Sequence, residues 1–132
     1  MNNILITGAY GFIASNLIRS LENKNNFNLY SIGTNTKNSS INIKTHKHIE
    51  SPINITNLET LCDNELPDVI VHCAGIGTVL DASDILKSQK SMIETSEAVF
   101  SYAKLNKINK VIFLSSAAVY GNSLLKKSQR LN

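Results

Sequence analysis

Cysteine is scarce in this sequence, and its two occurrences form no metal-binding or disulfide pattern. Cys62 and Cys73 are the only cysteines, and they make no C-x-x-C pair. Cys73 lies in the apolar run "DVIVHCAG", so we interpret it as a small buried hydrophobic side chain. His46 and His48 would share one face of a possible strand, but no third ligand is near and we take both as surface residues. We therefore predict no metal site.

Long apolar segments and clusters of one charge are also missing. The N-terminal apolar stretch is too short for a signal peptide, and no window approaches the roughly 20 apolar residues of a membrane-spanning helix. Thirteen basic and ten acidic residues give a net charge of +3, and no basic run is longer than Lys126 and Lys127. This pattern gives little support to a nucleic-acid or membrane partner, and we expect a cytoplasmic protein.

What the sequence does contain is a regular alternation of strand-like and helix-like segments. Its 132 residues, 42% of them hydrophobic, are enough for one core, so we treat residues 1–132 as one domain. The predicted strands are Ile4–Thr7, Asn28–Ile32, Val69–Cys73, Val111–Leu114 and, more weakly, His46–Ile49. The predicted helices are Phe12–Leu21, Asn57–Leu66 and Ser88–Leu105. The apolar face of the first would consist of Ile13, Leu17, Ile18 and Leu21. That of the third would consist of Met92, Val99, Phe100 and Ala103. The alternation predicts an α/β fold with a doubly wound parallel sheet.

The segment "TGAYGFIA" joins the first strand directly to the first helix. Gly8 would permit a tight turn, and Gly11 would let a ligand approach the backbone without an intervening Cβ. The helix would then begin beneath the ligand, where its unpaired N–H groups suit a pyrophosphate. An ordinary loop with two glycines is the alternative. The position of this turn predicts the strand order 3-2-1-4-5, with the turn at the carboxyl end of the central strand.

Three segments, taken in order, resemble one known family. "ITGAYGFIASNL" is similar to the pattern T-G-x-x-G-F-I-G/A-x-x-L, "DVIVHCAGIGTV" to D-x-V-x-H-x-A-A, and "VIFLSSAAVYG" to a fifth strand that ends S-S-x-x-V-Y-G. These are patterns of the extended short-chain dehydrogenase/reductases, the NAD-dependent epimerase/dehydratase family that acts on nucleotide sugars. The resemblance spans essentially the whole chain and implies a Rossmann-like domain that binds NAD or NADP.

The resemblance assigns a catalytic role to one serine. The family's catalytic hydroxyl falls on Ser116, which would hydrogen-bond the sugar hydroxyl being oxidised while a tyrosine takes its proton and hydride moves to the nicotinamide. Without the flanking motif, Ser115 and Ser116 would be interpreted as a polar strand end. Tyr120 matches the structural tyrosine of V-Y-G, and we assign it no catalysis.

The family's Y-x-x-x-K motif, which supplies that tyrosine, does not occur in this sequence. The tyrosines are at 10, 30, 102 and 120, and none is followed by lysine four residues later. The sequence ends just where the family runs into the helix that bears the motif. We therefore expect an N-terminal part, truncated before the later strands, that lacks the Tyr-Lys half of the active site and the substrate domain. We also expect a fifth strand partly exposed at a sheet edge, and for that reason a homodimer.

The residues after the second predicted strand are compatible with either NAD or NADP. Family members that prefer NAD usually place an acidic residue after the second strand, but here the turn reads "SIGTNTKN", with Lys37 nearby. Asn54 stands where the family often has an aspartate near the adenine, Gly75 replaces an alanine, and Ser91 aligns with an asparagine that opens the helix before the fifth strand. The resemblance thus implies cofactor contacts from Gly8, Tyr10, Gly11, Phe12, Ile13, Gly33, Thr34, Asn35, Asn54, Ile55, Cys73, Ala74, Gly75, Ser91, Leu114 and Ser115.

The choice of reaction depends on two small residues. Sugar 4,6-dehydratases of this family carry an acidic pair where this chain has Ala117 and Ala118, and methyl groups cannot move a proton. We therefore favour the N-terminal part of a nucleotide-sugar epimerase or reductase over a dehydratase. A dinucleotide-binding module or subunit without catalysis is the second hypothesis, and an unrelated doubly wound protein that binds another nucleotide is the third.

Overall fold

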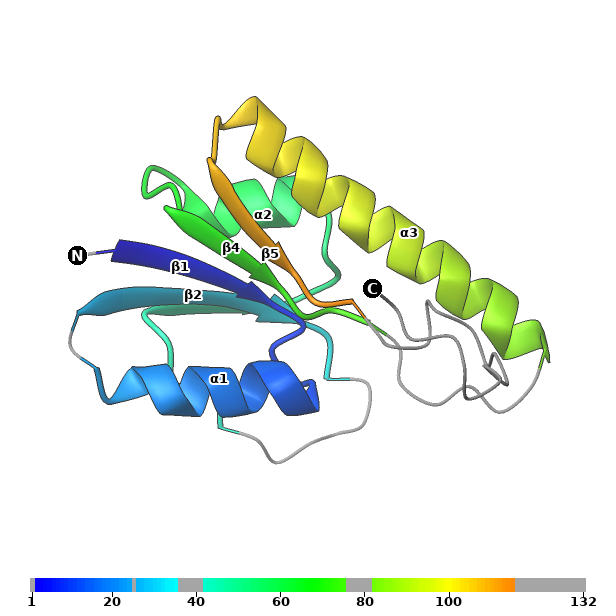
Figure 1. The fold of residues 1–132 in the computed structure, drawn as a ribbon, viewed down its shortest axis with the longest axis horizontal. Helices are drawn as coiled ribbons and strands as arrows, with labels where there is room; N and C mark the ends of the chain where they lie inside the picture. Colours follow the sequence, from blue (N-terminus) through cyan, green and yellow to red (C-terminus); the bar gives the residue numbers. More distant parts are fainter. Residues whose placement is uncertain (1, 25, 36–41, 76–81, 116–132) are drawn as a thin grey trace, which may run out of the picture.

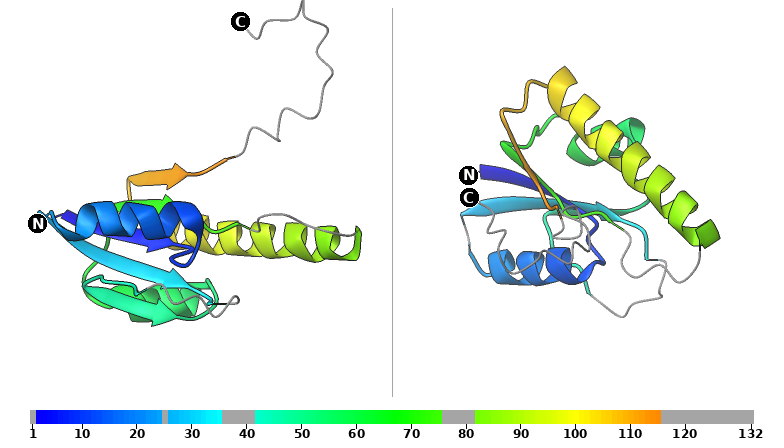
Figure 2. Two further views of the ribbon diagram at one scale, coloured as in Figure 1. Left: turned by 90° about the horizontal axis from the view of Figure 1, so that it is seen from below. Right: turned by 45° about the vertical axis from the view of Figure 1, so that its right-hand side comes forward.

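The computed structural model of the chain describes residues 2–24, 26–35, 42–75 and 82–115. Five strands form one parallel sheet in the order β3-β2-β1-β4-β5. They are β1 (Asn2–Thr7), β2 (Phe27–Gly33), β3 (Lys47–Glu50), β4 (Val69–His72) and β5 (Lys110–Phe113). The helices are α1 (Phe12–Glu22), α2 (Ile55–Cys62) and α3 (Ala82–Leu105). Figures 1 and 2 show α1 on one face of the sheet and α2 and α3 on the other. The predicted doubly wound sheet and its strand order are confirmed.

The register of the sheet brings the strand ends together at one edge. At that edge Thr7 of β1 lies opposite Ile32 of β2 and His72 of β4, and the next strand out places Glu50 opposite Gly33. Because every pair is parallel, the carboxyl ends of all five strands, with the described residues that directly follow them, face the same side. This is the side where open α/β sheets bind their ligands.

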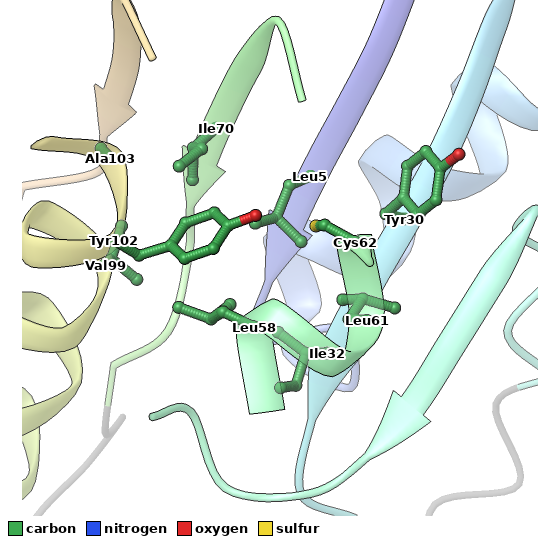
Figure 3. Close-up of a cluster of buried hydrophobic side chains, with 10 residues drawn as sticks. All are labelled: Leu5, Tyr30, Ile32, Leu58, Leu61, Cys62, Ile70, Val99, Tyr102 and Ala103. Atoms are coloured by element: carbon green, nitrogen blue, oxygen red, sulfur yellow. The ribbon is translucent and has the colours of Figure 1, made fainter. Parts of the chain in front are cut away.

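The larger part of the core lies between the sheet and the helices α2 and α3 (Figure 3). Its buried members come from β1, β2, β4, α2 and α3: Leu5, Tyr30, Ile32, Leu58, Leu61, Cys62, Ile70, Val99, Tyr102 and Ala103. A smaller cluster lies under α1 and consists of Ile6, Ala9, Ala14, Ile18 and Val71. The sheet is therefore covered on both faces, as the near-continuous apolar strands indicate.

The predicted apolar faces of α1 and α3 are correct at Leu17, Ile18, Leu21, Val99 and Ala103 and wrong at three other residues. Ile13 is 57% exposed, because Ala14 and Ile18, four residues apart, take the inward face of α1. In α3 the inward residues are Val99, Tyr102 and Ala103, while Phe100 is 47% exposed and stacks on Phe113 of β5. Met92 of the same helix is also exposed.

The observed bounds of α2 and α3 differ from the predicted ones. α2 begins at Ile55 instead of Asn57, because the Asn54 side chain accepts a hydrogen bond from the Asn57 amide and caps the helix. It ends at Cys62, before Asp63, whose φ of 38° leaves the helical range. α3 begins at Ala82, six residues before the predicted start.

The two histidines near β3 do not share a face, contrary to the prediction. His46 contacts the ring of Tyr30 and pairs with Glu65, on the α2 side of the sheet. His48 is partly buried and bonds Ser31, so it is not the surface residue that we expected. Cys73 is half-buried and packs at the margin of the cluster under α1.

Over the described ranges, none of the helices is long and apolar enough to cross a membrane. Within the same ranges, no three His, Cys, Asp or Glu side chains gather closely enough to hold a metal ion.

Candidate functional site

The site is built around the turn between β1 and α1. The amide N–H groups of Gly8 and Ala9 both donate to the carbonyl oxygen of Ile32, over 2.8 and 3.2 Å, so the turn lies across the end of β2. The Gly11 amide then donates to the Gly8 carbonyl over 2.8 Å and closes the turn. The first helical bond follows at once, from the Ser15 amide to the Gly11 carbonyl. The segment thus passes from strand to helix within a few residues.

Two glycines are required by close backbone packing. Gly8 has φ +75°, and a Cβ there would lie 2.8 Å from Cα and N of Ala74, in the loop after β4. A Cβ on Gly33 would lie 2.8 Å from the Ala9 nitrogen. Distances this short are not tolerated by real side chains. Gly8 and Gly33 therefore hold the turn tightly against the ends of the neighbouring strands.

The other two described glycines at this edge face open space. Gly11 is exposed, has φ −71°, and its Cβ would meet only the Gly8 carbonyl oxygen, at 3.1 Å. Gly75 is exposed, and a Cβ there would have no heavy atom within 4 Å. Gly75 has room for a side chain, whereas a Cβ on Gly11 would make one tight contact with the backbone, so packing within the described residues does not require glycine at 75 and constrains position 11 less than positions 8 and 33. Their bare backbone leaves space for a ligand.

The first turn of α1 supplies donors to that space. The amides of Phe12, Ile13 and Ala14 have no carbonyl one turn earlier in the helix, and Gly11 has no side chain to cap them. Phe12 and Ile13 are 85% and 57% exposed, which is unusual for large apolar side chains. Unpaired amides at the positive end of a helix dipole attract an anion such as a phosphate group.

A buried polar chain lies just under the turn. The Thr7 hydroxyl and Nδ1 of His72 are 2.7 Å apart, and Nε2 of His72 lies 3.3 Å from the Ser96 hydroxyl of α3. Burial lowers the pKa of His72, which favours its neutral form. These contacts join β1, β4 and α3 immediately before Gly8, and they fix the strand end from which the turn departs.

A second polar chain ties the turn to β3. The Tyr10 hydroxyl donates to Oε2 of Glu50 over 2.8 Å and lies 3.1 Å from Nε2 of His48, whose Nδ1 is 2.8 Å from the Ser31 hydroxyl. Burial first, then the bond to Glu50 and its charge, raise the pKa of Tyr10, so the phenol keeps its proton. Burial lowers the pKa of His48 although Ser31 and Glu50 favour its charged form.

The neutral form of His48 sets the direction of these hydrogen bonds. Tyr10 has one proton and donates it to Glu50, so Nε2 of His48 carries the hydrogen that the Tyr10 oxygen accepts. Nδ1 of His48 lies 2.8 Å from the Ser31 hydroxyl. The Tyr10 proton is directed toward the carboxylate of Glu50.

The structure brings most of the predicted site residues to the carboxyl edge of the sheet. Those at the turn or at strand ends are Gly8, Tyr10, Gly11, Phe12, Ile13, Gly33, Thr34, Asn35, Cys73, Ala74, Gly75, Leu114 and Ser115. Asn54 and Ile55 lie at the start of α2, where the Asn54 oxygen is engaged in capping. Ser91 is exposed in the interior of α3, nine residues after its first residue, and therefore does not open that helix as expected. Ser116 lies outside the described residues.

Sequence reasoning missed His48, Ser31 and Glu50. His48 was visible as one of a pair, but its contacts depend on the pairing of β3 with β2 across a long polar segment. The signal that could have found Glu50 is its position at the end of the weakest predicted strand. In a parallel sheet that end must reach the same edge as the glycine turn.

Two open hollows lie elsewhere, along α1. One of about 480 Å³ is lined by the end of α1, the start of β2 and residues 44–46, and one of about 420 Å³ by the middle of α1 and residues 42–44. Neither includes a residue of the glycine turn. We place the site at the turn because its geometry provides unpaired donors and a bare backbone, which the hollows do not.

Comparison with known sequences assigns the family. Residues 4–130 match the NAD dependent epimerase/dehydratase family, and the chain belongs to it. Comparison with curated proteins gives no match.

Solved structures agree with this fold. The UDP-Glc/GlcNAc 4-epimerase from Campylobacter jejuni is 26% identical with a TM-score of 0.79, over 92% of this chain and 39% of that protein. The enzyme WbmH from Bordetella bronchiseptica, solved with NAD⁺, is 23% identical with a TM-score of 0.80, and the match covers 100% of this chain and 44% of that protein. The dTDP-glucose 4,6-dehydratase from Bacillus anthracis, solved with NAD, is 20% identical with a TM-score of 0.79, and the match covers 100% of this chain and 42% of that protein. This chain therefore spans about two fifths of the length of these structures.

Proposed function

We propose that this chain is the dinucleotide-binding part of a nucleotide-sugar epimerase or reductase and that it binds NAD or NADP at the β1–α1 turn. The observation that carries the proposal is the uncapped first turn of α1, with Gly11 and Gly75 open beside it. A pyrophosphate fits such a cradle because it accepts hydrogen bonds from backbone amides and needs a surface without side chains. The family, and the NAD bound in two of the similar solved structures, support the same ligand.

The cofactor would be held by residues from several strand ends. Its pyrophosphate would lie over Gly8 and Tyr10–Ile13, and its adenosine near Gly33–Asn35 and Asn54. Asn54 can take part through Nδ2 because only its oxygen is used for capping. When bound, the nicotinamide supplies the hydride chemistry of the reaction.

Ser116 is the residue that we propose for orienting the sugar hydroxyl. Orientation alone does not move a proton, and no tyrosine of the 132-residue chain is followed by lysine four residues later. We therefore expect the chain by itself to give no steady epimerase or reductase turnover. The alternative is a dinucleotide-binding module or subunit without catalysis, and a gene product that continues into a Y-x-x-x-K motif would favour the enzyme.

Binding can be tested directly by calorimetry and NMR. Titration of NAD⁺ into the isotope-labelled chain should shift the amide signals of Gly11, Phe12 and Gly75, while Lys104 and Leu105 at the far end of α3 serve as internal references. Absence of heat and of any shift would reject the site. Turnover of a UDP-sugar by the pure chain would leave the binding site in place and reject only the expectation that this chain is inactive without a Y-x-x-x-K motif.

We also propose that the protein is cytoplasmic and forms a homodimer. The dimer is supported by β5, which is the last strand of the described sheet and pairs with β4: its Ile112 and Phe113 are 42% and 46% exposed, and Leu114 directly after it is 37% exposed. Exposed apolar strands at a sheet edge favour pairing with another chain. Light scattering at high concentration tests this, and a monodisperse monomer would contradict it.

A further inference from the structure

Between Glu22 and Glu59 the sequence contains one acidic residue, Glu50. None of the described residues that follow β2, Thr34 and Asn35, is acidic, although a carboxylate after the second strand is the usual partner for the ribose hydroxyls of NAD. The parallel pairing of β2 and β3 places Glu50 opposite Gly33, and the amide of Ser51 donates to the Gly33 carbonyl over 3.1 Å. The carboxylate missing after β2 is thus replaced in space by one at the end of β3.

We propose that Glu50 selects NAD over NADP by accepting the 2′-hydroxyl of the adenosine ribose and repelling a 2′-phosphate. The inference rests on the proposed function, because it concerns the adenosine end of the same site. Its basis is the bond from the Tyr10 hydroxyl, which holds the Glu50 carboxylate against the turn expected to bind the pyrophosphate. Tyr10 occupies one carboxylate oxygen, and no other described residue donates a hydrogen bond to this group. Within the described ranges the second oxygen has no donor, so it can accept a ribose hydroxyl.

Among the described residues, no cation pairs with the Glu50 carboxylate. Neutral His48 bonds Tyr10 and Ser31 instead of pairing with the carboxylate. The Lys47 ammonium donates to the carbonyl oxygen of Thr60 in α2, on the other face of the sheet. Glu50 itself is exposed, so its charge acts on a ligand at the edge and is not buried among protein groups. A 2′-phosphate carries a charge of up to −2 and would be placed beside it.

Substitution of Glu50 separates charge from hydrogen bonding. Calorimetric titration of the 132-residue chain with NAD⁺ and with NADP⁺ should give tighter binding of NAD⁺ by about tenfold. Glu50→Gln keeps an oxygen that Tyr10 can donate to but removes the charge, so the preference should fall to about threefold or less, mainly because NADP⁺ binds better. Glu22→Gln, at the opposite end of α1, removes the same charge and should keep the wild-type ratio.

Tyr10→Phe is the second variant. It removes the bond that holds the carboxylate but leaves the charge in place, so the preference for NAD⁺ should fall to a value between those of the wild type and Glu50→Gln. Circular dichroism and the unfolding midpoint establish that each variant is folded. If the wild-type chain binds both dinucleotides equally or prefers NADP⁺, or if Glu50→Gln keeps the wild-type ratio, the inference about Glu50 is wrong while the binding site stands. If neither dinucleotide binds the wild-type chain, the proposed function fails, and this inference with it.

Discussion

The helices α1 and α2 both begin at the carboxyl edge of the sheet, but their first turns are built differently. α2 is capped by Asn54, whose side-chain oxygen accepts the Asn57 amide over 2.8 Å. α1 begins after Gly11, which has no side chain to offer, and exposes 85% of Phe12. The start of α2 satisfies one of its donors with a side chain, whereas the start of α1 has no side-chain cap and leaves its donors to solvent or to a ligand. At the same edge of the sheet, the capped start of α2 is therefore built for stability and the uncapped start of α1 for binding a ligand.

The glycines show the same division. Gly8 and Gly33 are packed against backbone atoms at 2.8 Å, whereas Gly75 has no heavy atom within 4 Å of a Cβ position. A glycine required by packing affects stability, and one required by a ligand affects binding. Substitutions at the two kinds of position should therefore have different readouts.

The largest effect is expected at Gly8. Gly8→Ala adds a Cβ at a positive φ and places it 2.8 Å from the Ala74 backbone, so the free energy of unfolding should fall on the order of 3 kcal/mol. Chemical denaturation measures this. Gly75→Ala is the matched control, and its stability should stay within about 0.5 kcal/mol of the wild type. Equal losses in the two variants would mean that the close packing at Gly8 is relieved by movement of the loop after β4.

The next effect is expected in binding, at Gly11. Gly11→Val puts a branched side chain over the open amides of α1, so affinity for NAD⁺ should fall by at least about tenfold. Its φ of −71° suits any residue, so the variant should remain folded. Ser20→Val adds similar bulk near the far end of α1 and should bind as the wild type does. Unchanged heats for Gly11→Val would place the ligand elsewhere.

Much of the fold could be predicted because its signals are local. The apolar strands β1 and β4 and the amphipathic α1 can each be recognised within a dozen residues, and parallel order follows from their alternation with helices. Most of the predicted inward residues of α1 and α3, such as Ile18 and Val99, are buried. Ile13 and Phe100 are exposed, because they lie at the margins of the predicted faces and neighbouring positions are about 100° apart around a helix.

The site could be predicted only where it is contiguous. The turn from Gly8 to Ile13 lies in one stretch of sequence, whereas the contact of Tyr10 with Glu50 joins residues 40 apart. That contact depends on the register of β3, which follows a polar segment without period. The cap at Asn54 did have a signal, an asparagine just before an apolar helical pattern, but the resemblance assigned the residue to the adenine instead.

A smaller effect is expected at Asn54. Asn54→Ala removes the cap of α2 and should lower the free energy of unfolding by about 1 kcal/mol, while Asn54→Ser keeps a capping oxygen and should lose much less. Both variants lack the amide nitrogen proposed to reach the adenine, so both should bind NAD⁺ about fivefold more weakly. Denaturation and calorimetry separate the two roles. Binding like the wild type in Asn54→Ser would leave Asn54 as a cap alone.

The smallest effect is expected from pH, and it should reach the start of α1 but not that of α2. Burial lowers the pKa of His72 and His48 below the 6.5 of an unfolded histidine. The unfolded chain then binds more protons than the folded chain in mildly acidic solution. The free energy of unfolding is therefore at its full value above this pKa and falls as the pH drops through it.

NMR can localise this titration. His72 bonds Thr7, directly before Gly8, and His48 bonds Tyr10 within the turn, whereas the Asn54 cap contains no group that titrates in this range. Between about pH 7.5 and about pH 5.5 the amides of Gly8 and Tyr10 should shift, while the Asn57 amide should not. His72→Gln should weaken the pH dependence of stability, because the group that binds the proton is gone. Stability that rises on acidification would show that the neutral histidines are not the form the fold prefers, and equal shifts of the Gly8 and Asn57 amides would show that the two helix starts do not differ in their response to pH.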